Sequence, residues 1–556
     1  MKKKYLICFG FLVFCSCKSS KEFINPETGD PKLSWYQKDF ERNRIPGISL
    51  ERWYSQNRTK AKQDVIVAVI DTQIDKNHED LHDKIWTNSK EIADNNIDDD
   101  QNGYIDDIHG WNFTAKKDSY VVWGNFEYVR LVREFHGKFE NKKDIQITED
   151  ESSDCKEYLR ARAKLDESKK YYENKLKSLK YSVAVFPIAK DSLKPYFPKE
   201  DYTYEQLDSM YKIHKINDKT FRQRREDGDR DLGAMIGFMM LRLDLNEKRL
   251  ADVIESEIQV DSIVNKNLNI NFDERKFIGD NPNILEKGYG SKYISISKEG
   301  HRSFQDHSTK VSGIISAERN NNIGIQGIAE NVKIMPLTIS YSGDEHDKDI
   351  AMAIYYAVDN GAKVINMSFA KEFSLKQNWV SEAFKYAEKH NVLLVHAAGN
   401  EGVNIDENPI YPSDVNFKET KEICNNFINV GSISTRYDKT FVSRFSNFGK
   451  ENVDLFAPGE EIYTTAAGNI YKFDSGTSLA APMVSGTAAL IWSFYPRFTA
   501  SMVKKIIMDS GTAYDIEVVI PGSKDKTAPF SQLSKSGKVL NLYNAMKLAE
   551  KMYKKI

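Results

Sequence analysis

Several features that mark other classes of protein are scarce in this sequence. Five cysteines occur in 556 residues, and three of them lie within the first 17. The other two, Cys155 and Cys424, are far apart, so a disulfide framework is absent and we expect two unpaired thiols, with a single bridge as the alternative. The net charge is −2, from 79 Lys and Arg against 81 Asp and Glu. This balance excludes a global electrostatic attraction to nucleic acid or to an anionic membrane.

The N-terminal apolar run is too short for a membrane-spanning helix. It covers residues 5–14, well short of the roughly 20 residues that cross a bilayer. Three lysines precede it and Cys15-Ser16-Cys17 follows it, which is the order of a signal peptide. Because Ser16 before Cys17 resembles a lipoprotein processing site, we expect a lipoprotein-type signal peptide at 1–17, a lipid anchor on Cys17, and export to the bacterial cell envelope. Secretion without lipid and an uncleaved anchor are the alternatives.

The remaining composition and pattern are those of an α/β protein, with 40% hydrophobic and 29% charged residues. Residues 64–70 form a continuous run rich in Val and Ile, typical of a strand buried on both faces of a parallel sheet, and the run ends at Asp71. Further strands are expected at 332–339, 362–367, 392–397 and 427–430, and intervening helices at 349–360 and 378–390. This alternation predicts a doubly wound, mostly parallel sheet flanked by helices, in which ligands bind at the carboxyl ends of the strands.

The stretch from 114 to 275 has a different pattern. Tyr158, Leu165, Tyr172 and Leu179 recur at every seventh residue in a segment rich in Lys and Glu. This spacing indicates a solvated helix with one narrow apolar stripe. A second apolar segment at 232–254 is its expected packing partner. We therefore predict a helical hairpin inserted into the sheet domain, with a separate binding module as the alternative.

One segment near the C-terminus resembles a known nucleophile motif. Acyl transfer from a peptide needs a nucleophilic hydroxyl, an imidazole to accept its proton, a carboxylate to orient the imidazole, and donors for the oxyanion. The segment Asp474-Ser475-Gly476-Thr477-Ser478-Leu479-Ala480-Ala481-Pro482 is similar to the nucleophile motif of the subtilisin-like serine proteases, with Ser478 opening a helix. For Ser478 alone, a helix N-cap after a glycine turn is the structural alternative.

The resemblance extends to the other catalytic groups, in the family's order Asp, His, Ser. Asp71-Thr72-Gln73-Ile74-Asp75 resembles the aspartate motif, and His307-Ser308-Thr309-Lys310-Val311-Ser312-Gly313-Ile314-Ile315 resembles the histidine motif. Asn400, after Ala397-Ala398-Gly399, matches the oxyanion asparagine. The resemblance implies that Asp71, His307 and Ser478 form a catalytic triad and that Asn400 binds the oxyanion. Taken singly, Asp71 would also fit a strand-end cap, His307 a surface histidine and Asn400 a turn asparagine.

The resemblance covers residues 60–113 and 275–552. It implies one peptidase domain at 60–552, interrupted by the insertion at 114–275 and preceded by an extension at 18–59. The implied protein is an exported serine endopeptidase with polypeptide substrates and no organic cofactor. By analogy, the walls of the first substrate pocket are Ser368, Phe369, Ala370, Ala397, Ala398 and Gly399. We expect this pocket to accept an apolar side chain.

A second chemical feature is the acidic segment at 98–107. Its alternating oxygen-bearing side chains around a glycine resemble a calcium-binding loop, and the candidate ligands are Asp98, Asp100, Asn102 and Asp106. His109 stands where a standard loop of this type has a bidentate glutamate. A solvated acidic turn is the alternative.

Four residues differ from the usual pattern of the subtilisin-like family: Gln73, Ser308, Lys310 and Ala370. Gln73 and Ser308 stand where the family has glycine, so they would be strained if their backbones required positive φ. The ammonium of Lys310 is expected to lower the pKa of His307. These differences leave a second interpretation open, an inactive pseudoprotease that acts as a surface binding or scaffold protein.

Overall fold

The protein is described by a computed structural model that covers residues 32–57, 59–117, 119–140, 152–295, 302–416 and 421–556. The described chain divides into two compact units. One comprises residues up to Val122 and from Glu274 onward, and the other comprises Trp123–Asp273. We call them the sheet unit and the helical unit. The predicted lipidation site, Cys17, lies outside the described residues.

The sheet unit is built on nine strands in the order β14-β17-β11-β10-β7-β6-β1-β5-β2. Neighbouring strands are parallel except for the antiparallel pair β14 and β17. The strands are β1 (Val65–Asp71), β2 (Trp111–Asn112), β5 (Val332–Thr338), β6 (Val364–Met367), β7 (Leu393–Ala397), β10 (Phe427–Ile433), β11 (Leu455–Pro458), β14 (Thr512–Ala513) and β17 (Lys538–Val539). The mostly parallel sheet confirms the predicted fold class.

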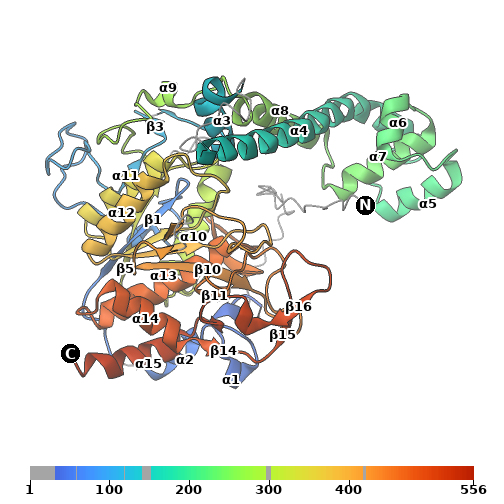
Figure 1. Cartoon of the computed structure of the whole chain (residues 1–556). Helices are drawn as coiled ribbons and strands as arrows, with labels where there is room; N and C mark the ends of the chain where they lie inside the picture. Colours follow the sequence, from blue (N-terminus) through green and yellow to red (C-terminus); the bar gives the residue numbers. More distant parts are fainter. Residues whose placement is uncertain (1–31, 58, 118, 141–151, 296–301, 417–420) are drawn as a thin grey trace. The chain divides into compact units, whose positions relative to one another are not determined.

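Helices pack on both faces of this sheet (Figure 1). The helices of the unit are α1 (Phe40–Asn43), α2 (Leu50–Gln56), α9 (Arg275–Ile278), α10 (Asp306–Ser316), α11 (Asp347–Asp359), α12 (Gln377–Lys389), α13 (Thr477–Phe494), α14 (Ala500–Ser510) and α15 (Leu542–Tyr553). Val67 and Val69 of β1 share a core with α10, α13, α14 and α15. Ala68 and Ile70 face a second core with α11 and α12. Alternate residues of one strand thus face two helical layers, as a doubly wound sheet requires.

Four two-stranded ribbons complete the sheet unit. They pair β3 (Ala115–Lys116) with β4 (Ser119–Tyr120), β8 (Val415–Asn416) with β9 (Lys421–Glu422), β12 (Ile462–Ala466) with β13 (Ile470–Asp474), and β15 (Glu517–Val519) with β16 (Thr527–Pro529). In the ribbon β12–β13, strand β13 leads directly into the segment that contains Ser478.

The helical unit contains α3 (Glu127–Phe139), α4 (Ser152–Leu193), α5 (Tyr204–His214), α6 (Phe221–Asp227), α7 (Leu232–Asp244) and α8 (Leu250–Ser262). The predicted stripe of α4 is buried as expected, from Tyr158 to Leu179. The predicted partner segment at 232–254 is divided between α7 and α8, and both helices contact α4. The predicted hairpin of two helices therefore contains too few helices. The apolar stripe of the 42-residue α4 is longer than one short helix can cover.

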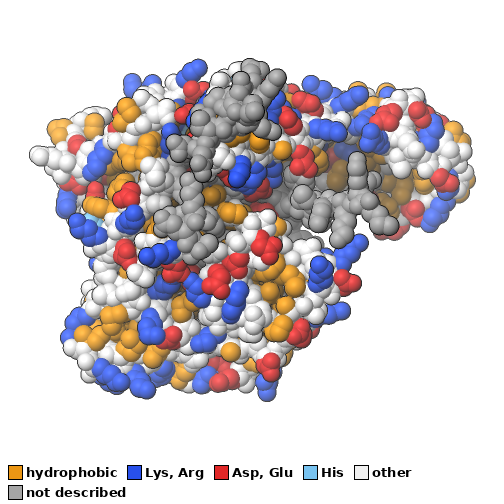
Figure 2. All heavy atoms as spheres, viewed as in Figure 1, with side chains coloured by type: hydrophobic (Ala, Val, Ile, Leu, Met, Phe, Trp, Pro, Cys, Tyr) orange, Lys and Arg blue, Asp and Glu red, His pale blue; other side chains and the backbone are white. Residues whose placement is uncertain are grey.

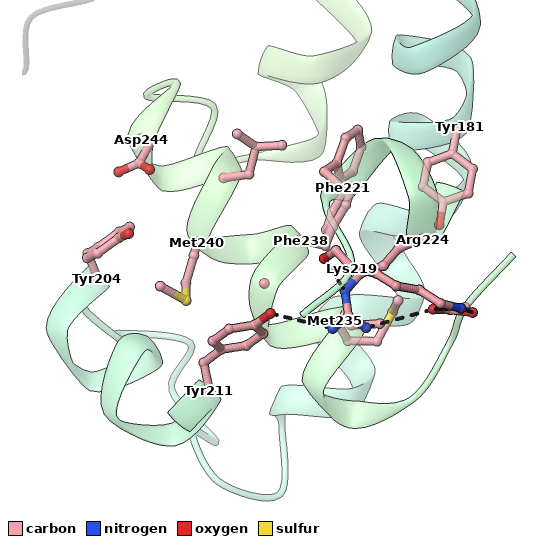
Figure 3. Close-up of a pocket in the computed structure, with 14 residues that line it drawn as sticks. Tyr181, Tyr204, Tyr211, Lys219, Phe221, Arg224, Met235, Phe238, Met240 and Asp244 are labelled. Carbon is pink, nitrogen blue, oxygen red and sulfur yellow. Dashed lines mark hydrogen bonds and ion pairs between the residues drawn. The ribbon is translucent and has the colours of Figure 1, made fainter. Parts of the chain in front are cut away.

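A cavity of about 230 Å³ lies among α4, α5, α6 and α7 (Figure 3). Its lining is mainly aromatic and thioether, including Tyr211, Phe238 and Met240. Two charged residues at its wall are paired with each other, since Lys219 Nζ lies 3.1 Å from Asp229 Oδ2. The cavity thus presents no uncompensated charge from this pair.

The surface agrees with the charge balance of the sequence. Acidic and basic side chains are interspersed over the face that Figure 2 shows.

Cys155 and Cys424 are both buried and unpaired, which confirms the prediction of two free thiols. Among the described residues, we find no helix with the length and apolarity needed to span a membrane.

Candidate active site

Asp71 is the last residue of β1, which lies between β6 and β5 in the sheet. Its side chain is almost completely buried. One carboxylate oxygen, Oδ1, accepts the backbone N–H of Thr72 at 2.7 Å and lies 2.8 Å from His307 Nδ1, while Oδ2 lies 3.0 Å from the same nitrogen. Because a carboxylate only accepts hydrogen bonds, Nδ1 is the donor, and a neutral His307 then has a free lone pair on Nε2.

His307 is the second residue of α10, and several hydrogen bonds fix this helix next to β1. The backbone N–H of Ser308 donates to Thr72 Oγ1 at 3.3 Å, and the backbone N–H of Asp75 donates to Thr309 Oγ1 at 2.9 Å. On its other side α10 packs closely against β12, since a methyl group on Gly313 would lie 2.0 Å from Thr465 Oγ1. The sequence thus holds His307 between the sheet and the β12–β13 ribbon.

The pKa of His307 is raised above its ordinary value. Burial opposes the imidazolium form, but the charge and hydrogen bond of Asp71 outweigh that effect. Lys310 acts in the lowering direction and Asp474 in the raising direction. The predicted lowering by Lys310 is therefore present as one contribution to the pKa of His307. Asp71 outweighs it because this carboxylate is in direct contact with the ring.

Ser478 is the second residue of α13, and it is the one residue of that helix that is not buried. Pro482 lies inside the first turns of α13. Proline has no N–H, so the carbonyl of Ser478, four residues earlier, receives no donor from the helix. Ser368 Oγ supplies one at 2.8 Å, and Asn366 Nδ2 donates in turn to Ser368 Oγ at 2.8 Å. The start of α13 is thereby tied to the end of β6.

Asn400 lies beside the same helix start. Its Oδ1 accepts the backbone N–H of Thr477 at 2.9 Å and the Thr477 hydroxyl at 3.0 Å. A methyl group built on Gly476 would lie 2.9 Å from Ser478 Oγ, 3.7 Å from Asn400 Nδ2 and 3.7 Å from Ser478 N. One position therefore lies close to a hydroxyl and to two N–H donors. Within the described residues, no hydrogen bond joins Ser478 Oγ to His307.

The six residues expected to form the substrate pocket lie in two different settings. The side chain of Ala397 is buried in the core that β1 shares with α10 and α13, and that of Ala398 is buried in a separate cluster that includes Phe441 and Phe456. Ser368 is buried at the hydrogen bond to Ser478. Phe369 and Ala370 are half-buried, and Gly399 has a φ of +102°. If these residues line a pocket, the buried ones do so through their backbone. Their role in substrate binding stays a prediction.

Two of the four differences from the family pattern cause no backbone strain. Gln73 and Ser308 are both buried, and neither is among the described residues with positive φ. Ser308 lies in α10, where any L-residue has a favourable conformation. Replacing glycine at these positions therefore adds side-chain volume without the cost that positive φ would impose.

The acidic segment gathers a different set of carboxylates from the one the spacing predicts. Glu91, Asp100 and Asp107 have carboxylate oxygens within 4.8 Å of one another. Asp98 accepts the backbone N–H groups of Asn102 and Gly103 at 3.0 and 2.8 Å. Asp98 is thus engaged in the turn itself. Glu91 could not be identified from the spacing, because it lies outside the loop that the spacing defines.

Two further candidate ligands also have protein partners. Asp106 pairs with Lys292 at 3.0 Å, and although burial acts to raise the pKa of Asp106, Lys292 outweighs it and lowers the pKa. Asn102 Nδ2 donates to Asp107 Oδ2 at 2.9 Å. Burial, with the neighbouring Asp100, raises the pKa of Asp107 to about 6. Three converging carboxylates suit a hard divalent cation, so Glu91, Asp100 and Asp107 form a candidate metal site among the described residues.

Comparison with known proteins identifies the family. The model of the subtilase family matches residues 243–537, which is more than half of the chain. The chain belongs to the subtilase family. This subtilase is 39% identical over 189 residues to a thermophilic serine proteinase of a Bacillus species, across 34% of this chain and 43% of that protein. It is 31% identical over 244 residues to subtilisin DY of Bacillus licheniformis, across 41% of this chain and 82% of that protein.

Among solved structures, a protease from Pseudoalteromonas arctica aligns with 24% identity and a TM-score of 0.36, over 44% of this chain and 70% of that one. The match to the Bacillus proteinase spans less than half of that protein's length. The family match includes His307, Asn400 and Ser478 but begins after Asp71. The candidate role of Asp71 therefore depends on its contact with His307 rather than on the family match.

Proposed function

We propose that this subtilase is a serine endopeptidase that hydrolyses polypeptides through Asp71, His307 and Ser478. The observation that best supports it is the Asp71–His307 hydrogen bond at 2.8 Å, together with the one accessible residue of α13, Ser478. An inactive binding protein would not need a buried carboxylate that orients an imidazole. The family membership also favours the peptidase over that alternative.

In the proposed mechanism, His307 Nε2 accepts the proton of Ser478 Oγ while this oxygen attacks the peptide carbonyl carbon. Asp71 holds His307 in the required tautomer and stabilises the imidazolium that forms. The oxyanion accepts hydrogen bonds from Asn400 Nδ2 and the backbone N–H of Ser478. His307 then protonates the leaving amine, and water repeats the sequence to release the acyl group.

Two further statements complete the proposal. The N-terminal sequence supports export and a lipid anchor on Cys17 in a bacterial envelope. Glu91, Asp100 and Asp107 are proposed to hold calcium, which would stabilise the loop before β2 by compensating three close carboxylates. The proposed calcium site requires no role for the cation in the chemical step.

The decisive experiment is labelling of the full-length protein with a fluorophosphonate probe in the presence of calcium. The adduct is then located by mass spectrometry. We expect a single adduct on Ser478, and no adduct in Ser478→Ala or His307→Ala. A folded wild-type protein that remains unlabelled would contradict the peptidase proposal and favour the binding protein.

A separate measurement tests the anchor. Expression of the full chain in a bacterium should give a membrane-associated protein whose N-terminal peptide contains a lipidated Cys17. A Cys17→Ser variant should lose both properties. An N-terminus other than Cys17 in the mature wild-type protein would rule out the lipoprotein assignment.

A further inference from the structure

A cluster of four charged side chains lies between the histidine helix and the segment before the nucleophile. Lys310 Nζ lies 2.6 Å from Asp306 Oδ2 and 2.5 Å from Asp474 Oδ2. Asp306 Oδ2 also lies 2.6 Å from Lys472 Nζ. The two acids and the two lysines therefore form one connected, electrically balanced group.

The residues of this cluster come from the two segments that contain the proposed base and the proposed nucleophile. Asp306 immediately precedes His307, and Lys310 follows it by less than one helical turn, so both lie within the first two turns of α10. Lys472 and Asp474 end β13, and Asp474 stands four residues before Ser478. The ion pair between Lys310 and Asp474 thus joins the element that contains the base to the strand that leads to the nucleophile.

This link is partly shielded from solvent. The side chain of Lys310 is 8% exposed and that of Asp306 is 16% exposed, whereas that of Asp474 is 43% exposed. Burial acts to lower the pKa of Lys310, but its two carboxylate partners outweigh it and raise the pKa, so the ammonium persists through the neutral range. A partly buried pair of this kind is costly to break, because the remaining charge loses its partner.

Two members of the cluster act in opposite directions on the charge of His307. Asp71 and Asp474 favour the protonated imidazole, and Lys310 opposes it. Lys310 and Asp474 therefore have opposing effects. The more specific consequence of the ion pair is positional, because it constrains the distance between α10 and β13.

We propose that Lys310 is a positioning residue that sets the separation of His307 and Ser478 by bridging Asp306 and Asp474. This proposal rests on the proposed roles of His307 and Ser478. Because displacement of a catalytic group by about 1 Å can cost about 10²-fold in rate, loss of the bridge should lower turnover rather than substrate binding.

The test is a kinetic cycle with Lys310→Met, Asp474→Asn and the double variant in the full-length protein, assayed on a short chromogenic peptide. We expect kcat to fall about tenfold to hundredfold in each single variant, with KM nearly unchanged. The double variant should be no worse than the singles, because all three lack the same link. Lys310→Arg, which retains the cation, should recover most of the activity.

A matched control is Lys505→Met, which removes an exposed ion pair with Asp509 at 2.7 Å elsewhere in the sheet unit. It should leave kcat unchanged. The pH profile adds a readout that a purely structural role would not change. In Lys310→Met the acidic limb should move to higher pH, because Asp474 remains and still raises the pKa of His307. In the double variant the limb should return toward that of the wild type while kcat stays low.

Hydrogen exchange tests the bridge independently of activity. Peptides covering 306–310 and 472–478 should both exchange faster in Lys310→Met and not in Lys505→Met. Unchanged exchange in both segments, or wild-type kcat in Lys310→Met, would overturn the positioning role. A wild-type protein without turnover would refute the proposed function instead, and the exchange result would still decide whether the bridge exists.

Discussion

Helices α13 and α4 are both long, and they are stabilised in opposite ways. Every residue of α13 except Ser478 is buried, so this helix is held from all sides by the sheet and its neighbours. In α4 the buried residues form one stripe along a helix of 42 residues, and most of its charged side chains face solvent. The difference shows where a side chain can be positioned closely. A helix that is packed all round fixes its one accessible hydroxyl, whereas a helix packed along a stripe tolerates change elsewhere.

The largest expected effect comes from adding one methyl group beside Ser478. Gly476 has a φ of 165°, which is extended backbone open to any residue, so Gly476→Ala should fold normally. The new methyl lies 2.9 Å from Ser478 Oγ and 3.7 Å from each of the two proposed oxyanion donors. We expect kcat/KM to fall by about 10³ or more, with an unchanged circular dichroism spectrum.

The matched control lies in the helical unit. Gly137 in α3 has no heavy atom within 4 Å of an added methyl. Gly137→Ala should leave kcat/KM unchanged and raise the stability of the unit by about 0.5–1 kcal/mol, because alanine is the better helix former. Equal loss of activity in both glycine variants would contradict the expected difference in sensitivity between the two units.

Calcium removal should give an intermediate effect that is confined to the sheet unit. We expect EDTA to lower the Tm of this unit by several degrees, because three close carboxylates then repel one another. Glu91→Gln should remove this sensitivity, and Asp98→Asn should retain it. If Asp98→Asn abolishes the response while Glu91→Gln keeps it, the ligand set predicted from the sequence spacing is the correct one. Differential scanning calorimetry distinguishes these outcomes.

The smallest effect concerns the buried carboxyl of Asp414. Burial, with Asp454 nearby, raises the pKa of Asp414 to about 7. A carboxyl whose pKa is raised in the folded state stabilises that state below its unfolded pKa of about 4, and this contribution is lost as pH rises to about 7. Asp414→Asn should therefore narrow the difference in Tm between pH 4 and pH 8 by a few degrees. A pH dependence identical to that of the wild type would show that Asp414 does not titrate in this range.

Much of the sheet unit was predictable from the sequence, because its strands are continuous apolar runs and its helices follow an apolar period. The predicted strand at 332–339 and helix at 378–390 agree with β5 and α12 to within a residue at each end. The nucleophile segment was equally recognisable, since its order of small residues leaves few structural alternatives.

Features that depend on residues distant in the sequence were not predictable. The partners of Lys310 come partly from β13, so its charge could be judged only once Asp474 was located. Glu91 joins Asp100 and Asp107 through folding of the loop, not through regular spacing. In the helical unit, the period of α4 predicted the buried stripe but not the number of helices that cover it.

The hydrogen bond between His307 and Asp71 joins residues 236 positions apart, with the whole helical unit between them in the chain. Closing so long a loop adds little to the thermodynamic cost, because loop entropy grows only slowly with length, but contacts between distant residues form late in folding. In the proposed mechanism, a ribosome-bound chain that has released β1 therefore has no general base until α10 emerges, and no nucleophile until α13 follows. The proposed peptidase activity would thus be acquired only near the end of synthesis.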